Sequence, residues 1–225
     1  MQYWITEFGI QGRKYDSSAF LEGTRLGTLH GLFILSRVLA AIAHPNVFAS
    51  LEYFNIGGQV GYGKDVLVNI STTAAPTVNG AGQMFAHVAS IANAQDSMQA
   101  LEVDAESAVL SSLPMKVLGK KLPCIQAASF SSSSSATVVA INRCNGTVET
   151  QLLCNTDSAL KYRMISYEAK LGDGRWAPLP PKDTPHPWSA PLHPTVISVE
   201  VTDSTLTLHL PALSLNIIER ESAAE

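Results

Sequence analysis

The stretch Trp4-Ile5-Thr6-Glu7-Phe8-Gly9-Ile10 ("WITEFGI") places one carboxylate near the end of an apolar, strand-like run. An apolar strand normally excludes glutamate, because taking an unpaired carboxylate out of water is costly. Two interpretations are open from this run alone. Either the strand ends at Thr6 and Glu7 faces solvent, or Glu7 has a function at the end of the strand. The segments that follow favour the second.

These segments predict a βαβ unit. After a strand over residues 3–8 and a polar loop, apolar residues recur every three or four positions over residues 18–43. This spacing predicts an amphipathic helix, and we expect it to stop at His44-Pro45 because proline disfavours helical geometry in the residue before it. A second strand is predicted over residues 47–54. Strand, helix and strand in this order indicate parallel pairing.

The remainder of the chain predicts one more helix and then a β-rich domain. Residues 57–80 are rich in Gly, Thr and Asn and are expected to be a loop, and a helix is predicted over residues 81–94. From residue 97 onward, short β-rich runs alternate with turn signals and predict an antiparallel β-sandwich. The runs are "MQALEV", "SAVLSSL", "LPCIQAASF", "ATVVAINR", "TVETQLL", "KYRMISYEA", "TVISVEV", "STLTLHL" and "SLNIIER".

Two βα units cannot cover both faces of a parallel sheet, because their strands need neighbours and a helix layer. The expected parent is an eightfold βα barrel, which takes about 250 residues. The predicted fold is therefore the last quarter of a TIM barrel over residues 1–96, followed by a β-sandwich over residues 97–225. Function in such barrels lies at the carboxyl ends of the strands, where Glu7 is expected.

Composition excludes several classes of function. The 225 residues are 46% hydrophobic and carry a net charge of -4, and the basic cluster typical of a nucleic-acid-binding face is absent. The longest apolar run, over residues 31–43, is too short and too polar for a membrane span. The sequence therefore predicts a soluble globular protein.

The three cysteines lack the spacing of a zinc site. Cys144 and Cys154 are ten residues apart around the turn signal Asn145-Gly146. We expect them to be bridged across neighbouring strands, leaving Cys124 free. Reduced, buried thiols are the alternative that the sequence leaves open.

Two N-x-S/T triplets begin at Asn69 and Asn145 and are candidate glycosylation sites. Together with a disulfide they favour a secreted or extracellular protein. Residues 1–15 do not have the pattern of a signal peptide. The expectation is that a longer parent protein includes a portion before Met1.

The order of segments resembles one enzyme group. "WITEFG" resembles the nucleophile strand, the seventh of the barrel, in clan-A glycoside hydrolases, which include α-L-arabinofuranosidases and glucuronidase- and heparanase-like enzymes. The resemblance continues through nearly the whole chain, as the C-terminal portion of a longer protein. The matching segments are "LHGLFILSRVLAAI", "HPNVFASLEYFNIGG" as the eighth strand, "APTVNGAGQMFAHVASIA" as the last barrel helix, and "TVVAINR" and "LTLHLPALSLNIIER" in the β domain.

This resemblance implies a retaining glycosidase with Glu7 as its nucleophile. A second carboxyl group acts as acid and base, and in the family it belongs to an Asn-Glu pair at the end of the fourth strand. No segment before Glu7 in this sequence can carry that pair, so the 225-residue chain is expected to be inactive alone. The implied partner is a glycoside or polysaccharide, and no metal or organic cofactor is implied.

Residues near the second strand are further candidates. Tyr53, Phe54 and Asn55 at its end can contact a sugar, or they can pack at the barrel mouth. Glu52 can line the barrel or be a packed rim carboxylate, and Glu22 is expected to be solvated on the outer helix layer.

A second function from another class is a non-catalytic carbohydrate-binding or interaction module, with the β domain as the functional part. Its aromatic residues Trp176, Trp188, Tyr162 and Tyr167 can stack on sugars. They can equally cap the core of the domain or pack against the barrel.

Overall fold

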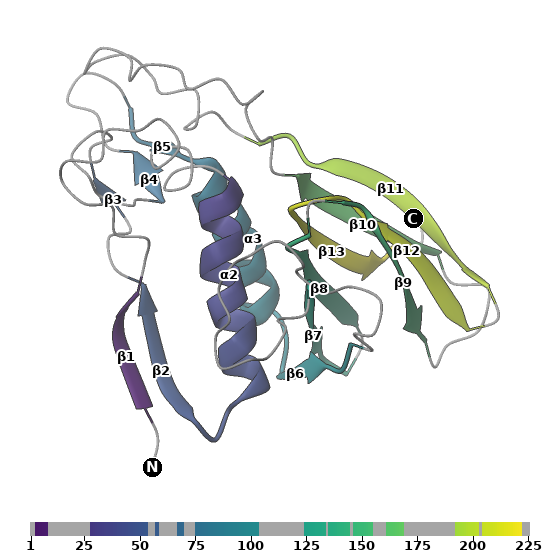
Figure 1. The fold of residues 1–225 in the computed structure, drawn as a ribbon, viewed down its shortest axis with the longest axis horizontal. Coiled ribbons are helices and arrows are strands. Elements are labelled where there is room, and N and C mark those ends of the chain that lie inside the picture. The colour runs from purple at the N-terminus through teal and green to yellow at the C-terminus, as the bar shows by residue number, and fades with distance from the viewer. Residues whose placement is uncertain are drawn as a thin grey trace. The chain divides into compact units, whose positions relative to one another are not determined.

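A computed structural model of the chain shows two groups of elements, drawn in Figure 1. Contacts divide the chain into two compact units, Met1–Ser90 with Ala169–His193 and Ile91–Glu168 with Pro194–Glu225. None of the described helices is long and apolar enough to cross a membrane. The structure describes residues 3–8, 28–53, 57–58, 67–69, 75–103, 124–133, 135–144, 146–154, 161–168, 192–202 and 204–221.

The first unit begins with the predicted βαβ order. Strand β1 (Tyr3–Phe8) pairs in parallel with β2 (Phe48–Tyr53), and helix α2 (Thr28–Ala43) lies between them in the chain (Figure 1). Parallel pairing is therefore confirmed. The predicted helix over residues 18–43 is confirmed from Thr28 onward, and it ends directly before His44-Pro45. Its predicted first part lies outside the described residues.

Helix α3 (Gly80–Asn93) packs closely on α2 through small residues. A Cβ atom added to Gly31 of α2 would lie 2.7 Å from Sδ of Met84 and 3.2 Å from Cα of Ala81. Beside this contact Ile34, Leu67 and Ala81 form a buried cluster. The absence of a side chain at Gly31 therefore allows the two helices to approach one another.

The start of α3 is fixed by a buried cap. Asn79 is fully buried, and its Oδ1 accepts a hydrogen bond of 2.8 Å from the Gly82 backbone N–H. Such a cap satisfies an N–H group that has no partner within the helix. The Asn79 N–H donates in turn to the Leu67 carbonyl oxygen at 3.0 Å. The cap thus ties the helix start to the preceding chain.

Residues 57–80, expected to be a loop, contain a small sheet within their described part. Strand β4 (Val68–Asn69) pairs in parallel with β3 (Gly57–Gly58) and antiparallel with β5 (Thr77–Val78). Strands of two residues have no periodicity that a sequence can show. The candidate glycosylation residue Asn69 is the last residue of β4.

We predict that Gly82→Ala destabilises the first unit. Helix propensity alone would make alanine better than glycine by about 1 kcal/mol. A Cβ atom at Gly82, however, would collide with the Leu67 carbonyl oxygen and approach Cγ1 of Val78 to 2.8 Å. Overpacking of this kind costs about 1–3 kcal/mol. Denaturant unfolding followed by circular dichroism should show a lower free energy of unfolding.

The control is Ala86→Gly, at an exposed position of the same helix. It should lower the free energy of unfolding by about 1 kcal/mol through propensity alone. A stabilising Gly82→Ala would mean that the close contact with Leu67 does not exist.

The second unit is one antiparallel sheet of eight strands, in the order β6-β7-β8-β13-β10-β11-β12-β9. Eight of the nine predicted runs form these strands, and the ninth, residues 107–113, lies outside the described residues. The strands are β6 (Ser97–Leu101), β7 (Ile125–Ser131), β8 (Ala136–Asn142), β9 (Val148–Leu153), β10 (Lys161–Glu168), β11 (Thr195–Thr202), β12 (Thr205–Leu210) and β13 (Ser214–Arg220).

A continuous, curled sheet replaces the two separate sheets of the predicted sandwich. The sheet changes direction at β11, which pairs with β10 through Thr195–Glu200 but with β12 only through Val201 and Thr202. Side chains from β12 then meet those of β8, β10 and β13 in one core. Its buried members are Cys124, Ile125, Ala140, Met164, Val201, Leu206, Leu208, Leu210 and Ile218. The alternation of the strands was predictable, whereas the path of the sheet depends on this pairing.

Asn142, at the end of β8, holds two connections of the sheet together. This fully buried side chain has its Nδ2 2.8–3.0 Å from the carbonyl oxygens of Gly146, Leu210 and Pro211. Its Oδ1 accepts a hydrogen bond of 2.9 Å from the Cys144 N–H. A buried amide is tolerated because its polar atoms have partners. Asn142 therefore joins the β8–β9 connection to the β12–β13 connection.

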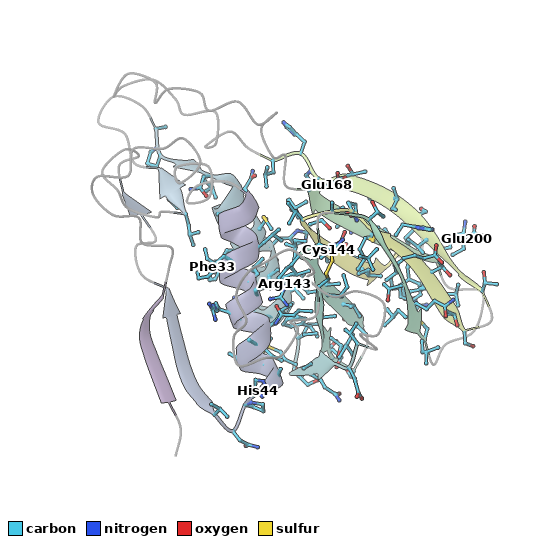
Figure 2. All side chains as sticks on the ribbon, in the orientation of Figure 1. Phe33, His44, Arg143, Cys144, Glu168 and Glu200 are labelled. Carbon is cyan, nitrogen blue, oxygen red and sulfur yellow. A yellow bond between two sulfur atoms is a disulfide. The ribbon has the colours of Figure 1, made fainter. Side chains whose placement is uncertain are left out.

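The predicted disulfide is wrong. Cys144 is bridged to Cys124, with Cα atoms 5.3 Å apart, and Cys154 is a free thiol (Figure 2). The prediction assumed that β8 and β9 are neighbours, but β8 pairs with β7 and β13 while β9 pairs with β12. Cys144 and Cys154 flank opposite ends of β9, and a six-residue strand spans roughly 20 Å.

We predict that Cys144→Ser lowers the free energy of unfolding of the second unit by about 3 kcal/mol. The bridge joins residues 20 positions apart, and cross-linking a loop of this size restricts the unfolded chain by about that amount. Urea unfolding of the wild type and the variant measures the difference.

Reductant is the matched control. It should bring the wild type to the stability of Cys144→Ser and leave the variant unchanged. A larger loss for Cys154→Ser than for Cys144→Ser would contradict the observed pairing.

Candidate active site at the carboxyl edge of the parallel strands

Strands β1 and β2 bring their carboxyl ends to one edge. Tyr3 pairs with Phe48 near the start of the two strands, and Phe8 pairs with Tyr53 at their ends. Strand β1 continues through Glu7 to Phe8, so the interpretation that the strand ends at Thr6 is wrong. Glu7 is the penultimate residue of β1, at the edge where parallel α/β folds bind ligands.

The register contains two irregularities, one between Tyr3 and Trp4 and the other at Glu7. Ile5 pairs with Leu51 and Phe8 pairs with Tyr53, with a register shift between them. Thr6 and Glu7 on β1 therefore oppose the single residue Glu52 on β2, which is the two-against-one count of a β-bulge. Bulges are over-represented at the rims of barrels and next to active sites, where they redirect a side chain. The backbone thus departs from regular pairing at the predicted nucleophile.

The other predicted contacts at this edge come from β2 and the residues after it. Tyr53 is the last residue of β2, and its backbone is opposite Phe8. Phe54 and Asn55 lie outside the described residues. The expected sugar contacts of these three residues stay predictions, as does glycosylation at Asn69 and at Asn145, which is also outside the described part.

Helix α2 between these strands is shielded from water around most of its circumference. Among residues 31–42 only Arg37 is exposed, and its guanidinium lies 5.0 Å from the ring centre of Phe33. This cation–π contact lets the one charged side chain of the helix cover an aromatic neighbour. A helix that is apolar on nearly all sides is typical of an interior layer.

Aromatic residues of the second unit are used for packing where the structure describes them. Tyr167 is buried, and burial raises the pKa of its hydroxyl group. Tyr162 is half-buried and packs against the sheet core. Trp176 and Trp188 lie outside the described residues. The two tyrosines therefore do not form an exposed platform for a sugar ring.

Titratable side chains of the second unit do not assemble a reactive centre in its described part. Cys154 is a partly buried thiol whose pKa is raised by burial, opposed by a backbone hydrogen bond at Leu206. Glu149 and His209 form an exposed pair, with Oε2 and Nδ1 3.7 Å apart. Within the described ranges, His, Cys, Asp and Glu residues form no group of three that could hold a metal ion.

The sheet contains a buried polar network that the sequence did not predict. Ser166 Oγ donates to Asn216 Oδ1 at 2.7 Å, and Asn216 Nδ2 donates to Ser214 Oγ at 2.8 Å. Ser214 Oγ donates to the Pro211 carbonyl oxygen at 2.6 Å. The only signal in the sequence is a polar residue at an apolar strand position. Because the network is internally satisfied, it fixes the turn after β12 and offers no group to a ligand.

Comparison with known proteins places the fold among glycoside hydrolases. No model of a known protein family and no curated protein matches the chain. A thermostable GH51 α-L-arabinofuranosidase from Thermotoga petrophila RKU-1 is similar over 98% of this chain and 43% of its own, with 11% identity and a TM-score of 0.70.

Two GH30 enzymes are similar as well. The catalytic domain of xylanase C from Talaromyces cellulolyticus matches 99% of this chain and 41% of its own, with 14% identity and a TM-score of 0.57. An endoxylanase from Clostridium papyrosolvens C71 matches 98% and 42%, with 12% identity and a TM-score of 0.52. At these identities the likeness shows the fold alone, and the chain spans less than half the length of each structure.

Proposed function

We propose that the chain is the C-terminal part of a retaining glycoside hydrolase in which Glu7 is the nucleophile. The observation that carries the proposal is the position of Glu7 at a register irregularity on the carboxyl edge of parallel strands. The fold similarity to GH51 and GH30 enzymes over nearly the whole chain supports it.

The proposed chemistry requires two carboxyl groups about 5–5.5 Å apart. The Glu7 carboxylate attacks the anomeric carbon while the second group protonates the leaving oxygen. The glycosyl ester formed on Glu7 is then hydrolysed by water, which the second group deprotonates, and Glu7 returns as a carboxylate. We assign the second group to a part of the protein other than residues 1–225, as the family resemblance implies.

In this proposal residues 1–96 supply the last two βα units of a barrel, and residues 97–225 form the attached β domain. The connection of β1 to β2 through α2 is the crossover expected of such a unit.

We further propose a glycoside or polysaccharide substrate and a secreted or extracellular location. The substrate class follows from the proposed reaction. The Cys124–Cys144 bridge supports the location, because disulfides persist in oxidising compartments. The candidate glycosylation residue Asn145 is followed by Gly146, which is exposed. A Cβ atom added to Gly146 would meet no atom within 4 Å, so the space beside the candidate site is open.

We predict that Glu7 becomes covalently labelled during turnover of the natural polypeptide that contains this chain. A 2-deoxy-2-fluoro glycoside with a good leaving group should trap the glycosyl ester, because the fluorine slows its hydrolysis. Peptide mass spectrometry should find the sugar on Glu7. Glu7→Gln should abolish labelling and lower kcat on the order of 10⁴–10⁶-fold, as removal of a catalytic nucleophile does.

Glu102→Gln is the matched control, because Glu102 is exposed in the other unit. It should leave labelling and kcat unchanged. Labelling of a different carboxylate, or most activity remaining in Glu7→Gln, would refute the assignment.

The isolated 225-residue chain should show no turnover of aryl glycosides. Loss of acid and base assistance costs on the order of 10²–10⁴-fold, and loss of the groups that orient the sugar costs more. Assays with chromogenic furanosides and pyranosides, on protein whose fold is verified by circular dichroism, provide the test. Efficient hydrolysis by the isolated chain would show that residues 1–225 hold a complete site.

A further inference from the structure

A second glutamate, Glu52 on β2, lies opposite Glu7 in the register of the two parallel strands. The pairs Ile5–Leu51 and Phe8–Tyr53 leave Thr6 and Glu7 on β1 opposite Glu52 on β2. Neighbouring strands are about 4.8 Å apart. Glu7 and Glu52 are thus adjacent along the carboxyl edge, although they are 45 residues apart in the chain.

When two carboxyl groups lie close together, each affects the ionisation of the other. A nearby like charge disfavours the ionised form, so the second of two neighbouring carboxyl groups loses its proton at a higher pH than the first. When the interaction exceeds about one pH unit, the observed pKa values belong to the pair rather than to either residue.

We propose that Glu52 is a positioning residue that titrates as a pair with Glu7. Between the two ionisations the pair holds one proton and one negative charge. The catalytic meaning of the pairing rests on the proposed function, since Glu52 would then set the pH above which the Glu7 nucleophile is ionised. The pairing itself rests on the register of β1 and β2.

The other titratable or charged residues of the described elements around the pair are few. Tyr3 lies at the start of β1 and Tyr53 at the end of β2, while α2, which adjoins β2, carries His30 and Arg37. Tyrosine has an ordinary pKa near 10, well above that of glutamate. Within this set, His30 alone has an ordinary pKa near the range in which a raised glutamate would titrate.

The test is a carboxyl ¹³C NMR titration of the 225-residue chain labelled at glutamate Cδ. In the wild type, the Glu7 and Glu52 signals should follow two shared steps, the higher one about one pH unit or more above the ordinary glutamate value of about 4.3. In Glu52→Gln the Glu7 midpoint should fall by about one pH unit or more towards that value. In Glu7→Gln the Glu52 midpoint should fall reciprocally.

His30→Gln tests whether the histidine contributes to the two titration steps. If the steps belong to Glu7 and Glu52, both should remain in this variant. Glu102→Gln should move neither midpoint. An unchanged Glu7 midpoint in Glu52→Gln, or an equal shift in Glu102→Gln, would overturn the pairing. Glu7→Gln and Glu52→Gln both keep the size of the glutamate side chain. If one of these two variants does not fold, the titration of the other is sufficient.

The titration tests the pairing of Glu7 with Glu52, and the labelling tests Glu7 as the nucleophile, so either result can be negative without the other. Coupled titration without labelling would leave the pair intact and refute the proposed function. Labelling of Glu7 without coupling would support the nucleophile and overturn the role of Glu52. In an active parent enzyme, Glu52→Gln should also move the acid limb of the pH dependence of kcat/KM to lower pH.

Discussion

Parallel pairing of β1 with β2 is the constraint on which the candidate site depends. Each strand alone is six residues of mainly apolar chain, and neither indicates a site. The pairing aligns their carboxyl ends, and the extra residue on β1 opposite Glu52 places Glu7 where regular alternation is interrupted. An antiparallel pair would have put Glu7 beside the start of β2. The proposed chemistry therefore depends on strand direction and register as much as on residue type.

Helices α2 and α3 make their close contacts at glycine positions, where no side chain separates the helix from its neighbour. Gly31 faces Met84 and Ala81, and Gly82 faces the Leu67 carbonyl oxygen, so backbone approaches backbone at both places. The Asn79 cap fixes where α3 starts and joins it to the chain before it. Such contacts leave little freedom to slide, because shifting either helix would bring larger side chains into the same space.

The second unit is organised by its curled sheet and by two links at one end of it. The core is filled from both sides of the bend, with Leu206 and Leu208 on one side and Met164 and Ile218 on the other. Asn142 and the Cys124–Cys144 bridge fix the connections that follow and precede the central strands. The described tyrosines and the buried polar groups are used for this packing. Catalysis is proposed for the first unit.

Local pattern determined much of this protein. Alternating and helical periodicities predicted the strands and both helices, because these periods are properties of the backbone itself. The proline after His44 fixed the end of α2, and the position of Glu7 before a helical segment predicted a site. Long-range pairing was decided by the tertiary structure alone. The partner of Cys144, the curl of the sheet at β11 and the adjacency of Glu7 and Glu52 join residues far apart in sequence. No local propensity encodes which strands become neighbours, since that choice is made by burial of the whole core.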